Sequence, residues 1–335
     1  MAEPMRPGSA ALGLVGDIGG TNARFALVAL DQPLPRLLAP ESRPTAKYND
    51  LAEAAEAYLR EQWYLGRPLT ASIAVAGPVR HNAARLTNLH WCIEGGAFAR
   101  RLGLAHASVI NDYTALSLAL PWFASADLAC IGGPALRVDT ATEDCRAVVG
   151  PGTGLGAGIL HAVGGSMRPI ASEAGHASFA PQDEEEIEIC RVLLRRCGRV
   201  SNERILSGPG LQLLFETLGE IHGVAPEPRS AAQIVEAACR GDHPLSLRTA
   251  QRFCAILGAY AGDVALIAGA RTGVYLAGGI LPRMAGILAQ GQFRARFENK
   301  APLQHHMAGI PTPLVVHPYP GLLGAATHLW NAMQA

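Results

Sequence analysis

The dipeptide Asn111-Asp112 combines a carboxylate and a carboxamide at a point where a ligand can be bound. It follows the apolar segment Val109–Ile110, which we predict as a buried strand, and precedes a predicted helix that starts at Tyr113. Ligands of open α/β sheets bind beyond the carboxyl ends of the strands. An aspartate there can act as general base for a substrate hydroxyl, while the asparagine orients the same substrate. The alternative is that Asp112 caps the following helix.

Two further polar segments are candidates: a loop with Glu173 and His176, and, separately, Glu203 ahead of Ser207-Gly208-Pro209-Gly210. Glu173 and His176 stand three residues apart around a glycine, so they can offer hydrogen-bond partners to vicinal hydroxyls. A metal site would need a further ligand at matched spacing, and the H-E-x-x-H pattern is absent. A structural role for His176 and an ordinary surface position for Glu203 are the alternatives.

The segment Gly16–Asn22 has the composition of a phosphate-binding turn. It separates two apolar runs, Ala11–Val15 and Ala23–Leu30, which we predict as the strands of a hairpin. Because glycine has no Cβ, the backbone N–H groups of such a turn can approach a phosphate closely. Asp17 adds a carboxylate that can hold a hydrated Mg²⁺ beside that phosphate.

Gly150–Gly156 repeats this pattern between Arg146–Val149 and Ala157–His161. Two phosphate-type hairpins in one chain predict a duplicated nucleotide-binding fold with ATP between its halves. The two lysines of the sequence, Lys47 and Lys300, stand in neither a G-x-x-x-x-G-K-[ST] loop nor a V-A-I-K strand. ATP would therefore be bound through backbone amides, hydroxyls and Mg²⁺.

The elements that must position these residues alternate between strand and helix, which is typical of a mostly parallel sheet. In the first third we predict strands at Ser72–Val75 and Ser108–Ile110 and helices at Ala52–Leu65 and Tyr113–Leu120. A hinge is predicted near Pro121. The elements predicted after the second hairpin are Glu184–Arg196, Pro209–His222, Ala231–Cys239, Ser246–Ala270, Val274–Leu276, a helix from Pro282, Val315–His317 and Gly321–Met333.

Composition limits the classes of function. The 335 residues are 49% hydrophobic with a formal net charge of +0, which argues against nucleic-acid and anionic-membrane partners. Seven scattered cysteines without a C-x-x-C pair indicate reduced thiols in a cytosolic protein. Met1–Ala10 lacks the apolar core of a signal peptide and is predicted to be a frayed tail. The apolar stretch Phe253–Ala270 is predicted to be a core helix rather than a membrane span.

Together these segments resemble the bacterial glucokinase family over nearly the whole chain, from about Leu12 to Trp330. The resemblance implies the actin-like, ribonuclease-H-like ATPase fold, with two α/β domains around a cleft. The expected small domain is 1–121 plus 313–335, and the expected large domain is 122–312. The motifs that carry the resemblance are Val15–Arg24, Ile110–Asp112, Gly150–Gly156, Glu173–His176, Ser201–Gly210, Ala277–Ile280 and Pro320–Gly324.

By this resemblance Asp112 is the catalytic base, and the sugar is bound by Asn111, Asp112, Glu173, His176 and Glu203. The resemblance also implies Mg²⁺ near Asp17, held through water. The implied nucleotide-binding residues are Gly16, Asp17, Ile18, Gly19, Gly20, Thr21, Gly152, Thr153, Gly154, Gly278 and Gly279.

The sequence departs from the family pattern at one position of Glu173–His176, the segment that we call the sugar loop. The family usually has two glycines between the glutamate and the histidine, and here the first is Ala174. If that position required a positive φ, alanine would strain the loop. Related sugar kinases carry a run of cysteines after this loop that binds zinc. No cysteine follows His176 before Cys190, so we expect no zinc.

The implied activity is ATP-dependent phosphorylation of glucose at O6, the first step of glycolysis, by a cytoplasmic homodimer. A kinase for another hexose, such as mannose or glucosamine, is the nearest alternative. A sugar-responsive regulator would need a helix-turn-helix and a basic patch, for which the N-terminal tail is too short. A filament-forming ATPase would not account for Asn111-Asp112 together with the Glu/His loop.

Overall fold

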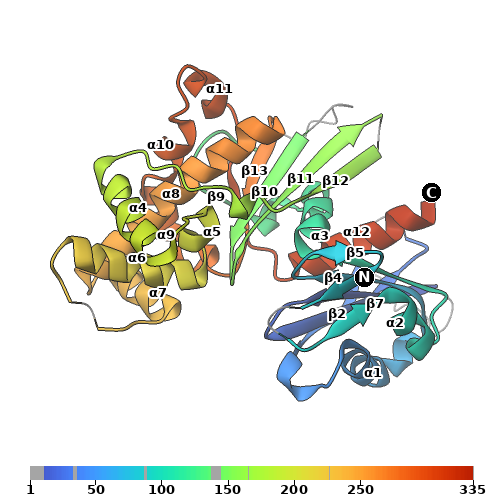
Figure 1. Cartoon of the computed structure of the whole chain (residues 1–335). Coiled ribbons are helices and arrows are strands. Elements are labelled where there is room, and N and C mark those ends of the chain that lie inside the picture. Colours follow the sequence, from blue (N-terminus) through green and yellow to red (C-terminus); the bar gives the residue numbers. More distant parts are fainter. Residues whose placement is uncertain are drawn as a thin grey trace. The chain divides into compact units, whose positions relative to one another are not determined.

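The structure is a computed structural model that describes residues 11–32, 36–86, 89–136, 145–164, 166–225 and 227–334. The chain divides into two compact units, Met1–Phe123 with Pro318–Ala335, and Ala124–His317 (Figure 1). The predicted frayed tail, Met1–Ala10, lies outside the described residues. Each unit has its own sheet and its own hydrophobic core.

A mixed sheet forms the centre of the first unit, with strand order β3-β2-β1-β4-β8. Strands β1 and β2 pair antiparallel from Leu12↔Ala29 to Ile18↔Ala23, which confirms the first predicted hairpin. Strand β4 lies parallel to β1, and β8 lies parallel to β4. The bounds are β1 Leu12–Ile18, β2 Asn22–Ala29, β3 Leu37–Pro44, β4 Pro68–Val75 and β8 His106–Asn111.

Helices cover both faces of this sheet. Side chains of α1 and α2 join one core cluster with β1, β2 and β4, while those of α12 join a second cluster on the other face. Helix α12 also packs closely on α3. The closeness is seen at Gly324, where a Cβ would come within 1.7 Å of the Ala115 carbonyl oxygen. The helices are α1 Leu51–Glu61, α2 Gly95–Leu102, α3 Asp112–Ala119 and α12 Pro320–Gln334, with short 3₁₀ turns η1 Thr45–Lys47, η2 Trp63–Leu65 and η3 Leu120–Trp122.

A small three-stranded sheet, which the sequence did not predict, packs against the edge strand β8. Its first turn contains His81 and Asn82, both at positive φ. The Asn82 side chain donates to the carbonyl of Ala107 at 2.9 Å and accepts from the N–H of Val109 at 2.6 Å. The side chain therefore satisfies edge groups of β8 that would otherwise be unpaired. The strands are β5 Val79–Arg80, β6 Ala83–Arg85 and β7 Cys92–Glu94.

The contact between α12 and β4 makes stability depend on pH. Nδ1 of His328 lies 3.2 Å from the hydroxyl of the fully buried Ser72. Burial lowers the pKa of His328 from its usual 6.5, and His106 nearby lowers that pKa further. The folded state therefore favours neutral His328, while the unfolded chain takes up a proton as the pH falls below about 6.5.

We expect His328→Gln to reduce the acid sensitivity of the folded state. Denaturant unfolding at pH 7.5 and pH 5.5 should show a smaller drop in the free energy of unfolding for the variant than for the wild type. His81→Gln, in the exposed turn of the small sheet, is the control and should follow the wild type. Equal acid losses in His328→Gln and wild type would show that His328 does not cause the effect.

The second unit is built around a six-stranded sheet of order β12-β11-β10-β13-β14-β9. Strands β10 and β11 pair antiparallel from Cys145↔His161 to Pro151↔Leu155, which confirms the second predicted hairpin. The last strand of this sheet in the chain spans Pro313–Val315, two residues earlier than predicted, and it pairs with the unpredicted strand β9. The bounds are β9 Leu128–Cys130, β10 Cys145–Pro151, β11 Leu155–Val163, β12 Ser166–Ser172, β13 Gly273–Leu276 and β14 Pro313–Val315.

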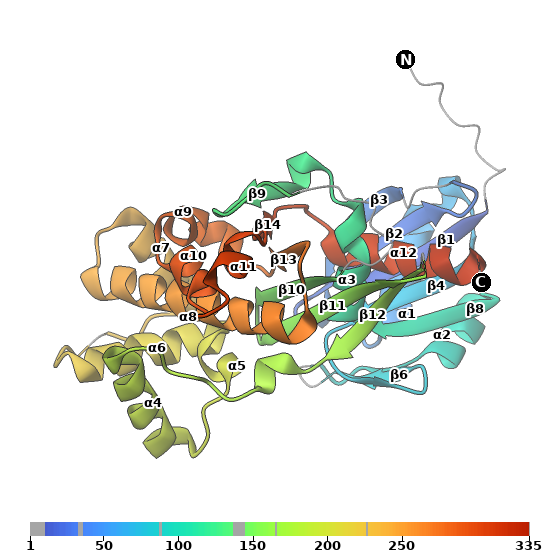
Figure 2. The ribbon, with the colours of Figure 1, turned by 90° about the horizontal axis from the view of Figure 1, so that it is seen from above.

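Helix α8 is the central helix of this unit and runs between α6 and α10 (Figure 2). Sixteen of its 25 residues are buried, as predicted for a core helix, and α10 approaches so closely that a Cβ at Gly258 would lie 2.1 Å from the Phe293 carbonyl oxygen. Among the described residues, no helix is both long and apolar enough to cross a membrane. The helices are α4 Glu184–Cys197, α5 Asn202–Ile205, α6 Gly208–Ile221, α7 Ala231–Arg240, α8 Pro244–Ala268, α9 Ala285–Gln290, α10 Phe293–Glu298 and α11 Gln304–Ala308, with 3₁₀ turns η4 Ser125–Asp127, η5 Ala174–His176 and η6 Leu281–Met284.

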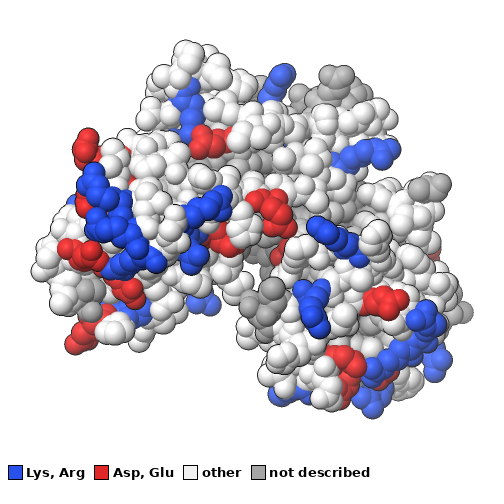
Figure 3. Space-filling view, viewed as in Figure 1, with Lys and Arg blue, Asp and Glu red and all other residues white. Residues whose placement is uncertain are grey.

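Charged side chains of both signs are mixed over the visible face of each unit (Figure 3). Many of the arginines are paired with carboxylates. For example, Arg101 contacts Asp50 and Glu56, and Arg196 contacts Glu220. This mixture of signs agrees with the neutral formal charge of the sequence.

Candidate active site

The first glycine loop is shorter than the sequence suggested. Gly16, Asp17 and Ile18 belong to strand β1, so the turn itself consists of residues 19–21, closed by the Gly19 N–H donating to the Asn22 carbonyl at 3.0 Å. Ile18 is fully buried in the core, and a Cβ at Gly16 would lie 2.9 Å from the Ile73 side chain. The side-chain positions of these two residues therefore serve packing, and only their backbone can face a ligand.

Thr45, which the sequence analysis did not single out, holds this turn in place. Its hydroxyl donates to the Gly20 carbonyl at 3.1 Å, and its N–H donates to the Thr21 carbonyl at 3.0 Å. Thr45 is 2% exposed, so both bonds lie under the surface. Both contacts use carbonyl groups of the turn, so they leave the N–H groups of Gly20 and Thr21 for another partner, while the Gly19 N–H is bound to Asn22.

Asp17 lies at the base of this turn with a cationic partner. Its Oδ2 accepts from Arg24 at 3.1 Å, directly across the hairpin. Burial raises the pKa of the Asp17 carboxyl, and the Arg24 guanidinium acts in the opposite direction. The first turn of α12 also approaches this group, since a Cβ at Gly321 would lie 2.7 Å from the Asp17 Cγ. Arg24 and the positive end of α12 thus oppose the rise in the pKa of Asp17 that burial causes.

Asn111, not Asp112, caps helix α3. The Oδ1 of Asn111 accepts from the N–H groups of Tyr113 at 2.9 Å and Thr114 at 3.1 Å, and its Nδ2 donates to the Gly77 carbonyl at 3.1 Å. Asp112 is the first residue of the helix, and its Oδ1 accepts from the Tyr113 N–H at 2.9 Å. The capping interpretation of Asp112 is therefore wrong. Asn111 retains one N–H of its carboxamide for a ligand.

The second glycine loop, Gly152–Gly154, is held by its neighbours in the second unit. The Gly152 N–H donates to the Gly154 carbonyl at 2.7 Å, and the N–H of Gly208, the first residue of α6, donates to the Gly152 carbonyl at 2.8 Å. Gly278 has φ +92°, and a Cβ there would lie 2.3 Å from the Pro151 carbonyl oxygen. Gly279 has no atom within 4 Å of such a Cβ.

The different surroundings of Gly278 and Gly279 predict different effects when each is replaced by alanine. Gly278→Ala is expected to destabilise the protein by about 1–3 kcal/mol, because alanine is strained at positive φ and collides with the loop. It should also raise the KM for ATP. Gly279→Ala should leave the thermal stability unchanged, because no protein atom lies within 4 Å of its Cβ position. Thermal unfolding and ATP kinetics of the two variants check this, and equal behaviour of both would contradict the steric account.

The sugar-loop residues Glu173 and His176 lie at the two ends of the 3₁₀ turn η5, with the His176 N–H donating to the Glu173 carbonyl at 3.0 Å. Ala174 is part of this turn and is not among the residues with positive φ, so its substitution for glycine causes no backbone strain. Gly175 is the position that requires glycine, because a Cβ there would lie 2.0 Å from the Leu155 carbonyl oxygen. Alanine at position 174 is therefore compatible with the backbone conformation of the sugar loop.

Glu203 connects the sugar loop with the glycine loop. Its Oε1 lies 3.6 Å from Nδ1 of His176, and its Oε2 accepts from the Leu155 N–H at 2.9 Å. A Cβ at Gly154 would come within 2.5 Å of the same Oε2, so this close approach requires glycine. The neighbouring Asn202, missed in the sequence, is buried and donates to the carbonyls of Ala177 and Ser178.

The described residues thus form two candidate groups, one in each unit. Asp17, Asn111 and Asp112 belong to the first unit, together with the first glycine loop. Glu173, His176 and Glu203 belong to the second, together with the loop Gly152–Gly154. Each group joins hydrogen-bonding carboxylates to a turn with the composition of a phosphate site.

Solved structures show the class of protein. A glucokinase from an Antarctic psychrotroph has a TM-score of 0.85 with 33% identity, over 96% of this chain and 99% of its own. A ROK-family glucokinase from Streptomyces griseus, 20% identical, shares the fold with a TM-score of 0.63 over 94% of this chain and 98% of its own. The fold is that of the sugar kinases with the actin-like ATPase architecture, as predicted.

Sequence relatives identify the family within this class. The family model described as Glucokinase matches residues 14–332. A curated glucokinase of Caulobacter sp. (strain K31) is 47% identical over 318 residues, which cover 95% of each chain. The chain therefore belongs to the glucokinase family, and the resemblance seen in the sequence is confirmed.

Proposed function

We propose that this chain transfers the terminal phosphoryl group of ATP to O6 of glucose. Membership of the glucokinase family supports this activity. The observation that carries it is the position of Glu203, whose two carboxylate oxygens contact His176 of the sugar loop and the Leu155 amide of the glycine loop. A hydroxyl-binding group and a phosphate-type turn are joined there by one side chain.

In this proposal the hydroxyls of the sugar are bound by Asn111, Asp112, Glu173, His176 and Glu203. Asp112 takes the proton of O6 as the bond to phosphorus forms. Asn111 gives its remaining N–H to a sugar hydroxyl, while its other contacts fix the end of β8.

Phosphoryl transfer depends mainly on positioning and charge neutralisation. The glycine loops 19–21 and 152–154, with Gly278 and Gly279, would supply backbone amides to the phosphates. Lys300 is not available for this role within the described structure, because its ammonium is paired with Asp263 at 2.5 Å. Neutralisation therefore falls to Mg²⁺ and to the loop amides.

The residues around Asp17 fit a hydrated Mg²⁺. Its Oδ2 is held by Arg24, while its Oδ1 is left for a metal-bound water. Among the described residues no group of three or more acidic, cysteine or histidine side chains forms a metal cage. One carboxylate together with substrate phosphates is the usual way in which proteins hold this ion. When bound, Mg²⁺ would neutralise charge on the phosphates; we propose no zinc.

A cytoplasmic homodimer remains our proposal for location and assembly. All seven cysteines are free thiols, which supports a reducing compartment. Sedimentation equilibrium would test the dimer directly.

A coupled ADP-release assay over a panel of hexoses with Mg·ATP tests the proposed substrate. Glucose should give the highest kcat/KM, because a missing or inverted hydroxyl leaves polar side chains such as Glu203 without a partner. Faster turnover of mannose or glucosamine would assign another hexose. ADP release that is independent of any sugar would favour an ATPase instead.

A further inference from the structure

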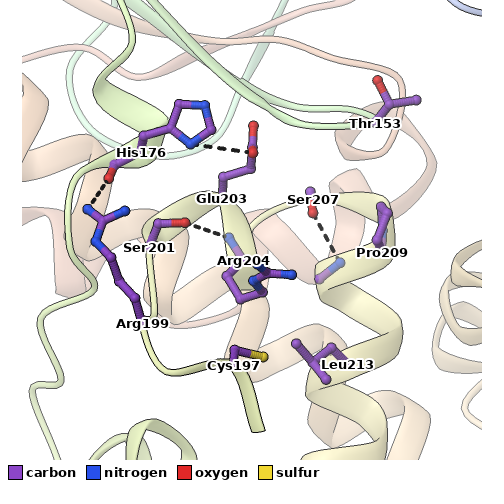
Figure 4. A pocket seen from close by; sticks show the side chains of 11 residues that line it. Thr153, His176, Cys197, Arg199, Ser201, Glu203, Arg204, Ser207, Pro209 and Leu213 are labelled. Carbon is purple, nitrogen blue, oxygen red and sulfur yellow. Dashed lines mark hydrogen bonds and ion pairs between the residues drawn. The ribbon is translucent and has the colours of Figure 1, made fainter. Parts of the chain in front are cut away.

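A cavity of about 420 Å³ lies in the second unit beside the proposed sugar and phosphate residues (Figure 4). Thr153 of the glycine loop, His176 and Glu203 line its upper part in that view, while Arg199 and Arg204 extend along its lower part. Its walls thus carry the sugar loop, the glycine loop and two cations at once. The family motifs assigned no role to either arginine.

The two arginines of the cavity differ in what they bind. Arg199 donates to the His176 carbonyl at 2.7 Å, so it supports the sugar loop. Over the described ranges, no carboxylate lies within ion-pair distance of the Arg204 guanidinium, although Glu203 is its neighbour in sequence. The arginines on the adjacent α4 all have glutamate partners, namely Arg191, Arg195 and Arg196. Arg204 is therefore a cation that faces the cavity with its charge unneutralised.

Helix α6 borders the same cavity but has no backbone donor to spare in its first turn. The Gly208 N–H is bound to the Gly152 carbonyl at 2.8 Å, and the Gly210 N–H is bound to the Ser207 hydroxyl at 3.0 Å. Pro209 between them has no N–H. An anion in the cavity must consequently be held by side chains, and Arg199 and Arg204 are the cations of its lining. Arg199 already donates to the His176 carbonyl, whereas the Arg204 guanidinium has no hydrogen-bond partner within the described part of the chain.

We infer that Arg204 binds a phosphoryl oxyanion in this cavity, an inference that rests on the proposed kinase function. The planar guanidinium matches phosphate oxygens in a bidentate arrangement. The guanidinium would neutralise part of the negative charge of the phosphate. No lysine stands next to the glycine loop in the sequence, so without Arg204 this role would fall to Mg²⁺ and the loop amides. The oxyanion belongs either to the phosphate chain of ATP or to a sugar phosphate. The bond between Gly208 and Gly152, which joins the cavity wall to the glycine loop, favours the phosphate chain.

Isothermal titration with tripolyphosphate and with glucose 6-phosphate tests this binding role. Arg204→Gln should bind tripolyphosphate about 10- to 100-fold more weakly than the wild type, the usual loss for one charge-assisted pair. Arg195→Gln is the matched control, since Arg195 is also an exposed arginine of this unit but lies outside the cavity. Both variants remove exposed side chains, so unchanged melting temperatures are expected.

The results distinguish the phosphate chain of ATP from a sugar phosphate. They also distinguish failure of the Arg204 inference from failure of the proposed kinase activity. Weaker binding of tripolyphosphate alone assigns the ATP phosphate chain, and weaker binding of glucose 6-phosphate alone assigns a sugar phosphate; either supports the inference. Wild-type affinity of Arg204→Gln for both compounds, or equal losses in Arg195→Gln, would overturn it. Turnover of glucose by the wild type is measured separately, so that failure of the kinase proposal is recognised even where the binding difference is present.

Discussion

Replacing Asp112 by asparagine is expected to lower kcat by roughly 10²–10⁴-fold while leaving the affinity for glucose near the wild-type value. Asparagine retains the size and the hydrogen-bonding oxygen of aspartate but cannot accept the O6 proton. Helix α3 should not lose stability, because its cap is the Asn111 side chain and not Asp112. Steady-state kinetics and glucose titration of the purified variant measure the two effects separately.

Asp50→Ala is the matched control for this experiment. Asp50 caps α1 in the same unit by accepting from the Glu53 N–H at 2.8 Å, and it also contacts Arg101. Its removal should cost about 1 kcal/mol of stability and leave kcat unchanged. If Asp112→Asn behaved like Asp50→Ala, with wild-type kcat and a lower melting temperature, Asp112 would be structural and the base would have to be sought elsewhere.

The second large effect is expected for Glu203→Gln, which should lower kcat/KM for glucose by roughly 10- to 100-fold. The carboxylate of Glu203 accepts from Leu155 with one oxygen and lies near His176 with the other. The amide keeps one acceptor and turns the second contact into a donor. The substitution should disturb the sugar loop and the glycine loop together, so the KM values for glucose and for ATP should both rise.

Glu216→Gln provides the comparison, because Glu216 is an exposed carboxylate on α6 that lies 3.9 Å from Arg196 and outside the cavity. Surface ion pairs of this kind contribute little, so its kinetics should match the wild type. A Glu203→Gln enzyme with unchanged kcat/KM would show that the bridge between the two loops has no part in catalysis.

Local patterns in the sequence predicted the elements that position the site. Both hairpins and the helix α6 follow from apolar periodicity, with Ser207 as the cap of α6 and Leu211, Leu214, Phe215 and Leu218 buried. The Asp17–Arg24 pair could also have been predicted, since the two residues face each other in the register of the hairpin. Such contacts depend only on neighbours along the chain.

Other features depend on contacts between distant segments and left no local signal. The bond from Leu155 to Glu203 spans 48 residues, and the approach of Gly321 to Asp17 spans more than 300. The three-residue strand β9 exists because β14 pairs with it, not because of an alternating pattern. Asn111 and Asp112 are both good caps by type, so only the end of β8 decides which of them caps α3.

The identity of the phosphorylated atom tests the central claim most directly. Wild-type protein incubated with Mg·ATP and glucose should give glucose 6-phosphate in the ³¹P spectrum, in step with ADP. 6-Deoxyglucose, which lacks O6, should give no phosphorylated sugar although it can occupy the same hydroxyl-binding residues. A sugar 1-phosphate, a phosphorylated 6-deoxyglucose, or ADP and inorganic phosphate without any sugar phosphate would contradict transfer to O6.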